Sequence, residues 1–298
     1  MNIQEIVLFN ASKFRKAIVI NRPSKKIKSP YLADIKLFDD ANNLIDIEHL
    51  AHSPTLGCNG MIAPNVIVYV TENNDEKDEK RKSKYTIFNI QISNPEIIIG
   101  VHPMTANAIF ENILKNNIID EFKDAINIRR EVKILNSRID FYCEINGKKI
   151  FLEVKNVPIA DYINSPIEDK KDKKDKKDKK DKSVINTNAS EYNQYEKIGL
   201  FPLGYRKKKE DLISPRAYKH LEDLIEIQKK ENHQAYLIYI IQRSDVKYFS
   251  PSLIDKTYYD KVYEAIDNGV KVIPLLVIWK DEHVYFSKIA EFLPKIIS

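Results

Sequence analysis

Apolar and polar side chains alternate along residues 130–157, on both sides of the dipeptide Asn146-Gly147. Both residues of an Asn-Gly pair tolerate the positive φ of a type I′ turn, so this alternation predicts a two-stranded hairpin. With the pair as the loop, Ile145 lies opposite Lys148, and one face of the hairpin is wholly apolar. That face consists of Ile139, Phe141, Cys143, Ile150, Leu152 and Val154. A shift of one residue would mix the two faces, which supports this register.

The same register places Asp140 directly opposite Glu153 on the other face, with Cβ atoms about 4.5–5.5 Å apart. Lys155 lies one pleat further along that face, and Glu131 joins it if the preceding strand alternates in the same way. Two carboxylates this close repel each other, and a cation between them relieves the repulsion. The alternative interpretation is a solvated strand face with ordinary cross-strand charge pairs.

Two acids and a lysine in the order D…ExK on adjacent strands predict a divalent metal site beside a fixed positive charge. Oxygen ligands of this kind suit Mg²⁺ or Mn²⁺. The predicted metal ligands are Glu131, Asp140 and Glu153, and Lys155 completes the predicted catalytic set. Such a site can activate a water molecule and stabilise charge on a phosphoryl group.

The N-terminal third has a different pattern, with short β-rich segments separated by turn residues and little helical periodicity. Several strands at this spacing predict a small barrel. The predicted strands cover residues 16–20, 31–38, 66–71 and 85–92.

Basic residues cluster in two loops of this region, beside Tyr31 and Tyr85. Charge with interleaved aromatic residues is how single-strand-binding barrels hold nucleic acid. A third basic stretch lies further along the chain, just before Ser214. The candidate nucleic-acid-binding residues are Lys26, Lys28, Arg81, Lys82, Arg206, Lys207 and Lys208. The alternative is that these are ordinary surface loops.

The C-terminal two thirds combine helical and strand patterns. Pro103 opens a helical spacing of apolar residues that runs to Phe122, and Ser214-Pro215 is a typical helix start. His220 lies just off the apolar stripe of that second helix, where we interpret it as a boundary residue. A strand over residues 235–242, a helix over 258–267 and a strand over 270–279 follow. This order predicts a mixed α/β sheet.

Charge adds little to this picture. The chain has 298 residues and a formal net charge of +5, but residues 168–182 alone, with nine lysines and six acids, contribute +3. A nucleic-acid-binding surface must therefore come from local clustering of basic residues. The repeated Lys-Lys-Asp triplets carry no apolar residue, so we predict a disordered insertion over residues 163–197.

Composition also excludes several classes of protein. Cys58 and Cys143 lie far apart in the chain, which argues against a disulfide framework or a cysteine-rich zinc module. The glycine-rich motifs of dinucleotide-binding proteins and nucleoside triphosphatases do not occur. The apolar runs fall short of the roughly 18 residues that a membrane helix needs, and the N-terminal segment is too polar for a signal peptide. We therefore expect a soluble intracellular protein, cytoplasmic or nuclear, without a membrane partner.

Several blocks, in order along the chain, resemble the SfsA family, the sugar fermentation stimulation protein A group. The segments SRIDF and LEVKNV match its central signature. The matching blocks lie at residues 30–34, 51–57, 81–86, 100–103, 137–141, 152–157, 201–202, 219–221, 242–245, 254–255 and 268–270. The resemblance covers nearly the whole chain except the Lys-Lys-Asp insertion.

The resemblance implies an N-terminal OB-like β-barrel in residues 1–95 and a restriction-endonuclease-like PD-(D/E)xK α/β domain in residues 96–298. It also implies a nucleic-acid partner, DNA in preference to RNA. It does not decide whether the protein forms an oligomer. By this match Asp140, Glu153 and Lys155 are the core acids and lysine, with Glu131 as the added acid. The leading hypothesis is a DNA-binding, metal-dependent nuclease-like protein that hydrolyses phosphodiester bonds. The alternative is a non-catalytic DNA-binding regulator with a vestigial nuclease fold.

Overall fold

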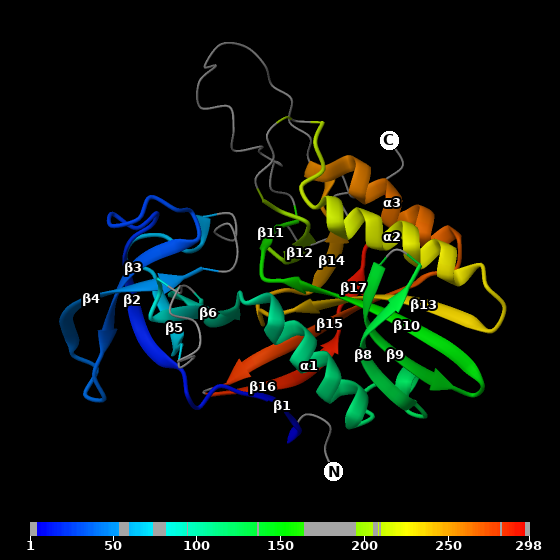
Figure 1. Ribbon diagram of the computed structural model, residues 1–298, viewed down its shortest axis with the longest axis horizontal. Helices are drawn as coiled ribbons and strands as arrows, with labels where there is room; N and C mark the ends of the chain where they lie inside the picture. Colours follow the sequence, from blue (N-terminus) through cyan, green and yellow to red (C-terminus); the bar gives the residue numbers. More distant parts are fainter. Residues whose placement is uncertain are drawn as a thin grey trace.

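The structure is a computed structural model of the chain. It describes residues 5–53, 60–73, 82–93, 95–135, 137–163, 195–204, 208, 210–280 and 282–295. Two bodies of unequal size lie side by side, the smaller formed by the N-terminal part of the chain (Figure 1). In the described part of the chain, no helix is both long and apolar enough to cross a membrane.

The larger body is built on a sheet of seven strands in the order β1-β16-β15-β13-β10-β9-β8. These strands are β1 (Val7–Asn10), β8 (Ile126–Ile134), β9 (Ser137–Ile145), β10 (Lys148–Val157), β13 (His233–Ile241), β15 (Lys271–Lys280) and β16 (His283–Ile289). Strands β10, β13 and β15 are parallel neighbours, and the other pairs are antiparallel. The mixed α/β class predicted from the sequence is therefore confirmed.

Helices cover both faces of this sheet (Figure 1). Helix α1 (Pro103–Lys115) packs on one face through a core that includes Phe110, Phe141 and Leu152. Helices α2 (Pro215–Gln228) and α3 (Lys256–Asp267) pack on the other face through a core that includes Leu221 and Tyr239. Short 3₁₀ turns cover Asp120–Phe122 and Leu253–Asp255. The sheet is thus buried on both sides, which fits its nearly continuous apolar central strands.

Both helix starts are where the sequence predicted them, but the first helix is shorter. It ends at Lys115, and Asn117 adopts a left-handed φ of 52°. A residue in this conformation ends a helix, and asparagine tolerates it better than most side chains. Residues up to Phe122 continue as a turn and a 3₁₀ segment. The helical spacing of apolar residues in the sequence therefore extends past the end of the helix itself.

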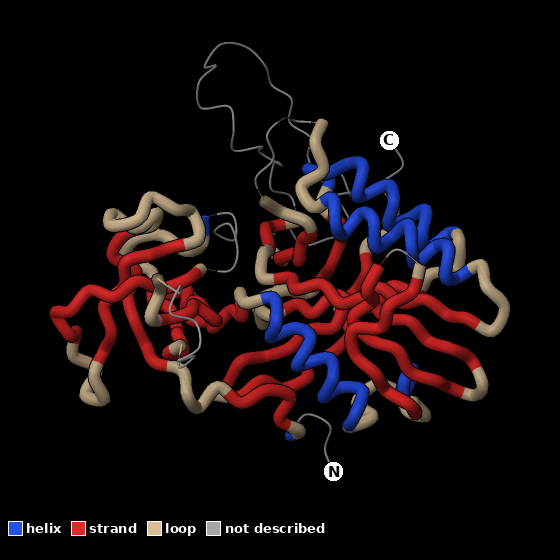
Figure 2. Tube along the Cα trace, in the orientation of Figure 1, coloured by secondary structure: helices blue, strands red, loops and turns tan. Residues whose placement is uncertain are grey.

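The smaller body is built from strands and loops (Figure 2). Its strands are β2 (Arg15–Asn21), β3 (Leu32–Phe38), β4 (Leu44–His52), β5 (Ile67–Glu72), β6 (Tyr85–Ser93) and β7 (Glu96–Gly100). Their order is β4-β3-β2-β5-β6-β7, and β4 also pairs in parallel with β6. The strand order therefore returns to its first member, around an apolar interior that includes Val19, Ile35 and Val68.

A third sheet of four short strands lies beside the larger one. It has the order β11-β12-β14-β17. The strands are β11 (Ala160–Tyr162), β12 (Lys197–Phe201), β14 (Tyr248–Pro251) and β17 (Glu291–Phe292). The predicted insertion falls between the first two, and residues 164–194 of it lie outside the described residues. Its two ends belong to the fold, however: Ile163 is fully buried, its N–H donates to the Glu196 carbonyl, and β12 begins at Lys197.

Two strands lie across the predicted division at residue 95, which stays a prediction. Strand β1 pairs with β16 at the edge of the larger sheet, although it precedes the smaller body in the chain. Strand β7, beyond residue 95, pairs with β6 in the smaller body. The chain thus starts in the larger body, forms the smaller one, and returns at α1.

Candidate functional site

The central hairpin has the predicted turn and register. Asn146 and Gly147 adopt φ values of 50° and 77°, as a type I′ turn requires. Ile145 pairs with Lys148, and the ladder between β9 and β10 continues in this register to the pair of Phe141 and Leu152.

The ladder ends at that pair, one step before Asp140 and Glu153. The Val154 N–H, on β10, donates to Asp140 Oδ2 at 2.8 Å, so a side chain replaces the strand partner. Ile139 packs in the core under α2, although Phe141 packs in the core under α1. The alternation of β9 is therefore broken between these residues, and the predicted apolar face does not include Ile139.

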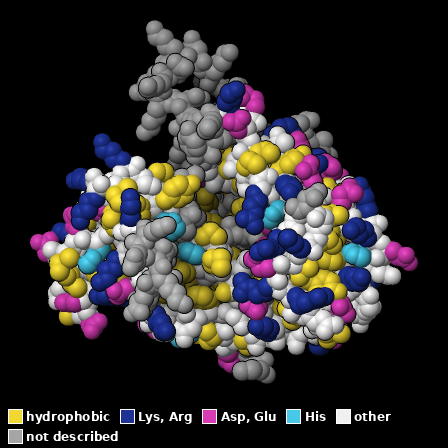
Figure 3. Space-filling view, in the orientation of Figure 1, with side chains coloured by type: hydrophobic (Ala, Val, Ile, Leu, Met, Phe, Trp, Pro, Cys, Tyr) yellow, Lys and Arg dark blue, Asp and Glu magenta, His cyan; other side chains and the backbone are white. Residues whose placement is uncertain are grey.

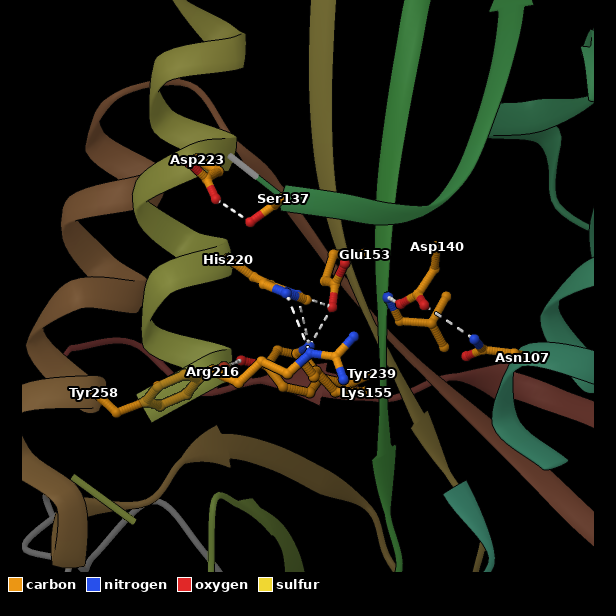
Figure 4. A network of polar contacts seen from close by, with 11 residues as sticks. Asn107, Ser137, Asp140, Glu153, Lys155, Arg216, His220, Asp223, Tyr239 and Tyr258 are labelled. Atoms are coloured by element: carbon orange, nitrogen blue, oxygen red, sulfur yellow. Dashed lines mark hydrogen bonds and ion pairs between the residues drawn. The ribbon is translucent and has the colours of Figure 1, made fainter. Parts of the chain in front are cut away.

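This break also corrects the prediction that the two carboxylates share one face. Asp140 Oδ1 accepts a hydrogen bond at 3.0 Å from Asn107, on α1. Glu153 instead contacts His220 on α2, and β10 runs between the two acidic side chains (Figure 4). A shared strand face therefore no longer supports the predicted metal site. Support for such a site must come from the contacts that each carboxylate makes.

Glu153 is a buried carboxylate with unequal oxygens. Its side chain comes from the middle of β10 and is 1% exposed. Oε1 accepts from both Lys155 Nζ and His220 Nδ1. Oε2 is buried and has no hydrogen-bond partner among the described residues. Burial disfavours the charged form, but Lys155 and His220 outweigh burial and lower the pKa of Glu153 to about 2.

Asp140 lies in a different electrostatic setting. Burial, and after it the negative charge of Glu153, raises the pKa of the Asp140 carboxyl above its usual value. Lys155 and the hydrogen bonds from Val154 and Asn107 act in the opposite direction. The two acidic groups are therefore close enough to repel each other, although they point to different helices.

Helix α2 contributes a histidine whose ring orientation follows from its contacts. His220 is 4% exposed, and Arg216 Nε donates to its Nε2 at 3.5 Å. A guanidinium can only donate, so Nε2 accepts in this contact, and Nδ1 faces Glu153 Oε1 and lies 3.4 Å from Lys155 Nζ. Arg216 and His220 are four residues apart, which places both on one side of the helix.

Sequence reasoning missed His220 and Asn107 as members of this cluster. His220 was interpreted as a boundary residue, and the structure instead buries it against Glu153. The i, i+4 spacing with Arg216 was a usable signal, but only a known helix position shows which face the pair occupies. For Asn107 the sequence holds no comparable signal.

Glu131 is not brought to the cluster. It is exposed, has a left-handed φ of 57°, and its carboxylate pairs with Arg138 at 3.1 Å. Within the described ranges, no three or more His, Cys, Asp or Glu side chains form a group that could hold a metal ion. A cation at this place would have Asp140 and Glu153 as its protein ligands. Two carboxylates fit Mg²⁺, which usually keeps several water ligands.

The candidate nucleic-acid-binding residues are spread over several loops. Lys26 and Lys28 are exposed between β2 and β3, Lys82 is exposed before β6, and Lys208 is exposed before α2. Arg81, Arg206 and Lys207 lie outside the described residues.

The loop that carries Lys26 and Lys28 is anchored by a buried acid. Asp34 is 1% exposed and accepts from Ser24 Oγ at 2.5 Å and from the Lys25 N–H at 2.8 Å. A carboxylate held by such bonds fixes the loop conformation, so these lysines are presented on an ordered segment.

Comparison with known proteins gives a consistent result. Residues 104–165 and 188–283 match the family model described as "Sugar fermentation stimulation protein RE domain" (SfsA). A sugar fermentation stimulation protein homolog of Clostridium beijerinckii is 29% identical over 76% of this chain and 79% of its own length. A homolog of the same name from Pelagibacter ubique is 29% identical over 88% of this chain and 90% of its own.

A solved structure with the same fold was also found. It is that of Pyrococcus furiosus SfsA in complex with Ca²⁺, with a TM-score of 0.69 and 16% sequence identity. The match covers 97% of this chain and 100% of the archaeal one. At this identity the likeness concerns the fold alone.

Proposed function

Since this chain belongs to the sugar fermentation stimulation protein (SfsA) family, we propose that it is a DNA-binding, metal-dependent nuclease-like protein that hydrolyses phosphodiester bonds. The observation that carries the proposal is Glu153, a buried carboxylate with one oxygen held by Lys155 and His220 and the other without a partner in the described structure. A buried charged oxygen without a partner is costly, and a cation offsets that cost.

The arrangement of elements supports a nuclease-like larger body. Helix α1, the three antiparallel strands β8, β9 and β10, helix α2 and the parallel strand β13 follow one another in the chain. We propose that this is the PD-(D/E)xK core, with Asp140 on its second strand and Glu153 and Lys155 on its third. For the smaller body, the additional pairing of β4 with β6 supports an OB-like barrel.

In this proposal Asp140 and Glu153 hold Mg²⁺ or Mn²⁺, and each is oriented by one further residue. Asn107 fixes Asp140, and His220 fixes Oε1 of Glu153 and leaves Oε2 for the ion. A bound divalent ion supplies a more acidic water and neutralises charge on a phosphoryl group. Lys155 places a positive charge beside the same point and stabilises negative charge that develops on the phosphate. The Ca²⁺ in the archaeal relative is of the same oxygen-binding class of ion.

The charge distribution supports an anionic substrate. Lys and Arg side chains gather on the face of the larger body that lies between α1 and α2 (Figure 3). Phosphate contacts from such residues supply most of the affinity of a protein for nucleic acid.

A second candidate function is a non-catalytic DNA-binding regulator. Glu153 already pairs with the Lys155 ammonium and contacts the His220 ring, and no metal group of three ligands occurs among the described residues. An ion-paired Glu153 is also what a structural site would contain.

Purified protein incubated with single-stranded and duplex DNA decides between these two functions. We expect cleavage with Mg²⁺ or Mn²⁺, none in EDTA, and its loss in Glu153→Gln, a variant of the same size without the charge. Equal cleavage by wild type and variant would assign the activity to a contaminant or to another site. Binding of DNA without cleavage under all these conditions would favour the regulator.

A further inference from the structure

An exposed arginine stands at the proposed site without an acidic partner. Arg216 lies in the first turn of α2, and its guanidinium lies next to His220 and Lys155 (Figure 4). Among the described residues, its only hydrogen bond runs from Nε to His220, and no carboxylate forms an ion pair with it. The Nη1 and Nη2 groups are left without protein partners in that part of the chain.

This arrangement differs from that of the other cations in the cluster. Lys155 is mostly buried and pairs with Glu153, so it acts on a phosphate as a positive charge beside that acid. Arg216 is exposed, and its Nε bond fixes the plane of the guanidinium. A planar fork whose Nη1 and Nη2 groups are both free matches the paired oxygens of a phosphate, whereas an ammonium group acts as a point charge.

We infer that Arg216 binds the phosphate group of a nucleic-acid substrate at this site, through Nη1 and Nη2. The inference rests on the proposed function and adds a substrate-binding residue to it. The bond to His220 links this residue to Glu153, so the phosphate is held on the α2 side of the pair of acids. In this role Arg216 contacts the substrate directly, whereas a positioning residue would act only by orienting His220.

Equilibrium binding tests this role without turnover. The probe is a fluorescein-labelled single-stranded DNA of about 20 nucleotides, measured by fluorescence anisotropy in EDTA at several salt concentrations. Arg216→Gln is expected to weaken binding about tenfold, the loss of one hydrogen-bonded charged contact. Its plot of log affinity against log salt should be shallower by about 0.7, the value for one phosphate on a single strand. Arg216→Lys keeps the charge but lacks the planar fork, so its DNA affinity should lie between those of wild type and Arg216→Gln.

Lys229→Gln is the matched control. It removes one positive charge at the opposite end of the same helix, about 20 Å away by helix rise, where Lys229 pairs with Glu226. Its affinity should stay within about twofold of wild type, because a distant exposed charge is screened by salt. Melting temperatures should not change in either variant, since both side chains are exposed.

Calorimetry with Mn²⁺ separates binding of phosphate from positioning of the acids. A phosphate-binding role predicts that Arg216→Gln binds Mn²⁺ as wild type does. Weaker Mn²⁺ binding together with unchanged DNA affinity would overturn the inference, because Arg216 would then act only through His220. If wild type binds and cleaves DNA and Arg216→Gln has the same affinity and salt dependence, this inference fails and the proposed function stands. If wild type binds no DNA, both fail.

Discussion

At the scale of single residues, Asp140 and Glu153 have opposite electrostatic tendencies. Burial and repulsion by Glu153 raise the pKa of Asp140, whereas Lys155 and His220 keep Glu153 ionised to a pKa of about 2. Two neighbouring acids whose pKa values are shifted in opposite directions are frequent at functional sites, although structural ion pairs also produce such shifts.

Two substitutions should separate ion binding from charge stabilisation. Asp140→Asn removes one negative ligand, so we expect Mn²⁺ affinity to fall by at least about tenfold and nuclease activity to fall with it. Lys155→Ala keeps both acids, so turnover should fall about 100-fold while Mn²⁺ affinity holds or rises. Calorimetry and single-turnover cleavage measure the two quantities. Parallel loss of both quantities in both variants would show that the lysine has no separate role.

Acid unfolding tests the state of Glu153. Its pKa is lowered from 4.5 to about 2 in the folded protein, so it stabilises the fold above pH 4.5 and loses this effect as pH falls through about 2. The full effect is on the order of 3 kcal/mol. Asp140 acts in the opposite sense, because its raised pKa lets the folded state take up a proton first.

The measurement is urea unfolding in EDTA between neutral pH and pH 2, on wild type and Glu153→Gln. We expect the difference in unfolding free energy between them to shrink as pH falls below 4.5, because only wild type loses the carboxylate contribution. A difference that is independent of pH would show that Lys155 and His220 do not hold Glu153 ionised.

At the scale of elements, the hairpin shows what the sequence could and could not predict. Asn146-Gly147 fixes the turn, and the turn fixes the register up to Phe141 and Leu152. Alternation assumes that the ladder continues, and here it stops where Asp140 accepts from the Val154 N–H. Helices α1 and α2 decide which way each acid points, and their positions on the sheet are not encoded in the local pattern.

The turn itself can be tested by one substitution. Gly147 has a φ of 77°, and a Cβ added there would have no other atom within 4 Å, so backbone conformation alone opposes a side chain. Gly147→Ala should therefore lower the unfolding free energy by about 1 kcal/mol. Gly147→Asn should cost less, since asparagine tolerates this region better. Equal stability of wild type and the alanine variant in urea would contradict the turn assignment.

At the scale of the whole molecule, one close contact joins the two bodies. A Cβ on Gly100, at the end of β7, would lie 1.8 Å from Gln242 Oε1. The Gln242 side chain is fully buried. Its Nε2 donates a hydrogen bond to Asn156 Oδ1 at 2.5 Å, and its Oε1 accepts one from Trp279 Nε1 at 3.2 Å. It therefore cannot move aside without losing hydrogen bonds.

Gly100→Ala should lower the unfolding free energy by about 2 kcal/mol, the usual cost of overpacking a tight site. Gly199→Ala is the control, because its added Cβ would have its nearest neighbour at 3.5 Å, an ordinary contact. Thermal unfolding compares the two variants. A Gly100 variant as stable as the Gly199 variant would show that the bodies do not meet this closely.

The pairing of β1 with β16 has a consequence for the order of events during synthesis. Val7 lies opposite Tyr285, so β1 cannot pair until β16, which comes much later in the chain, has left the ribosome. Strands β2 to β7 are complete by Gly100 and can pair at once. The strands of the smaller body can then be paired while β1, just ahead of them in the chain, still has an unpaired edge. Such an edge is exposed to wrong partners, which makes the elongating chain a natural client for chaperones.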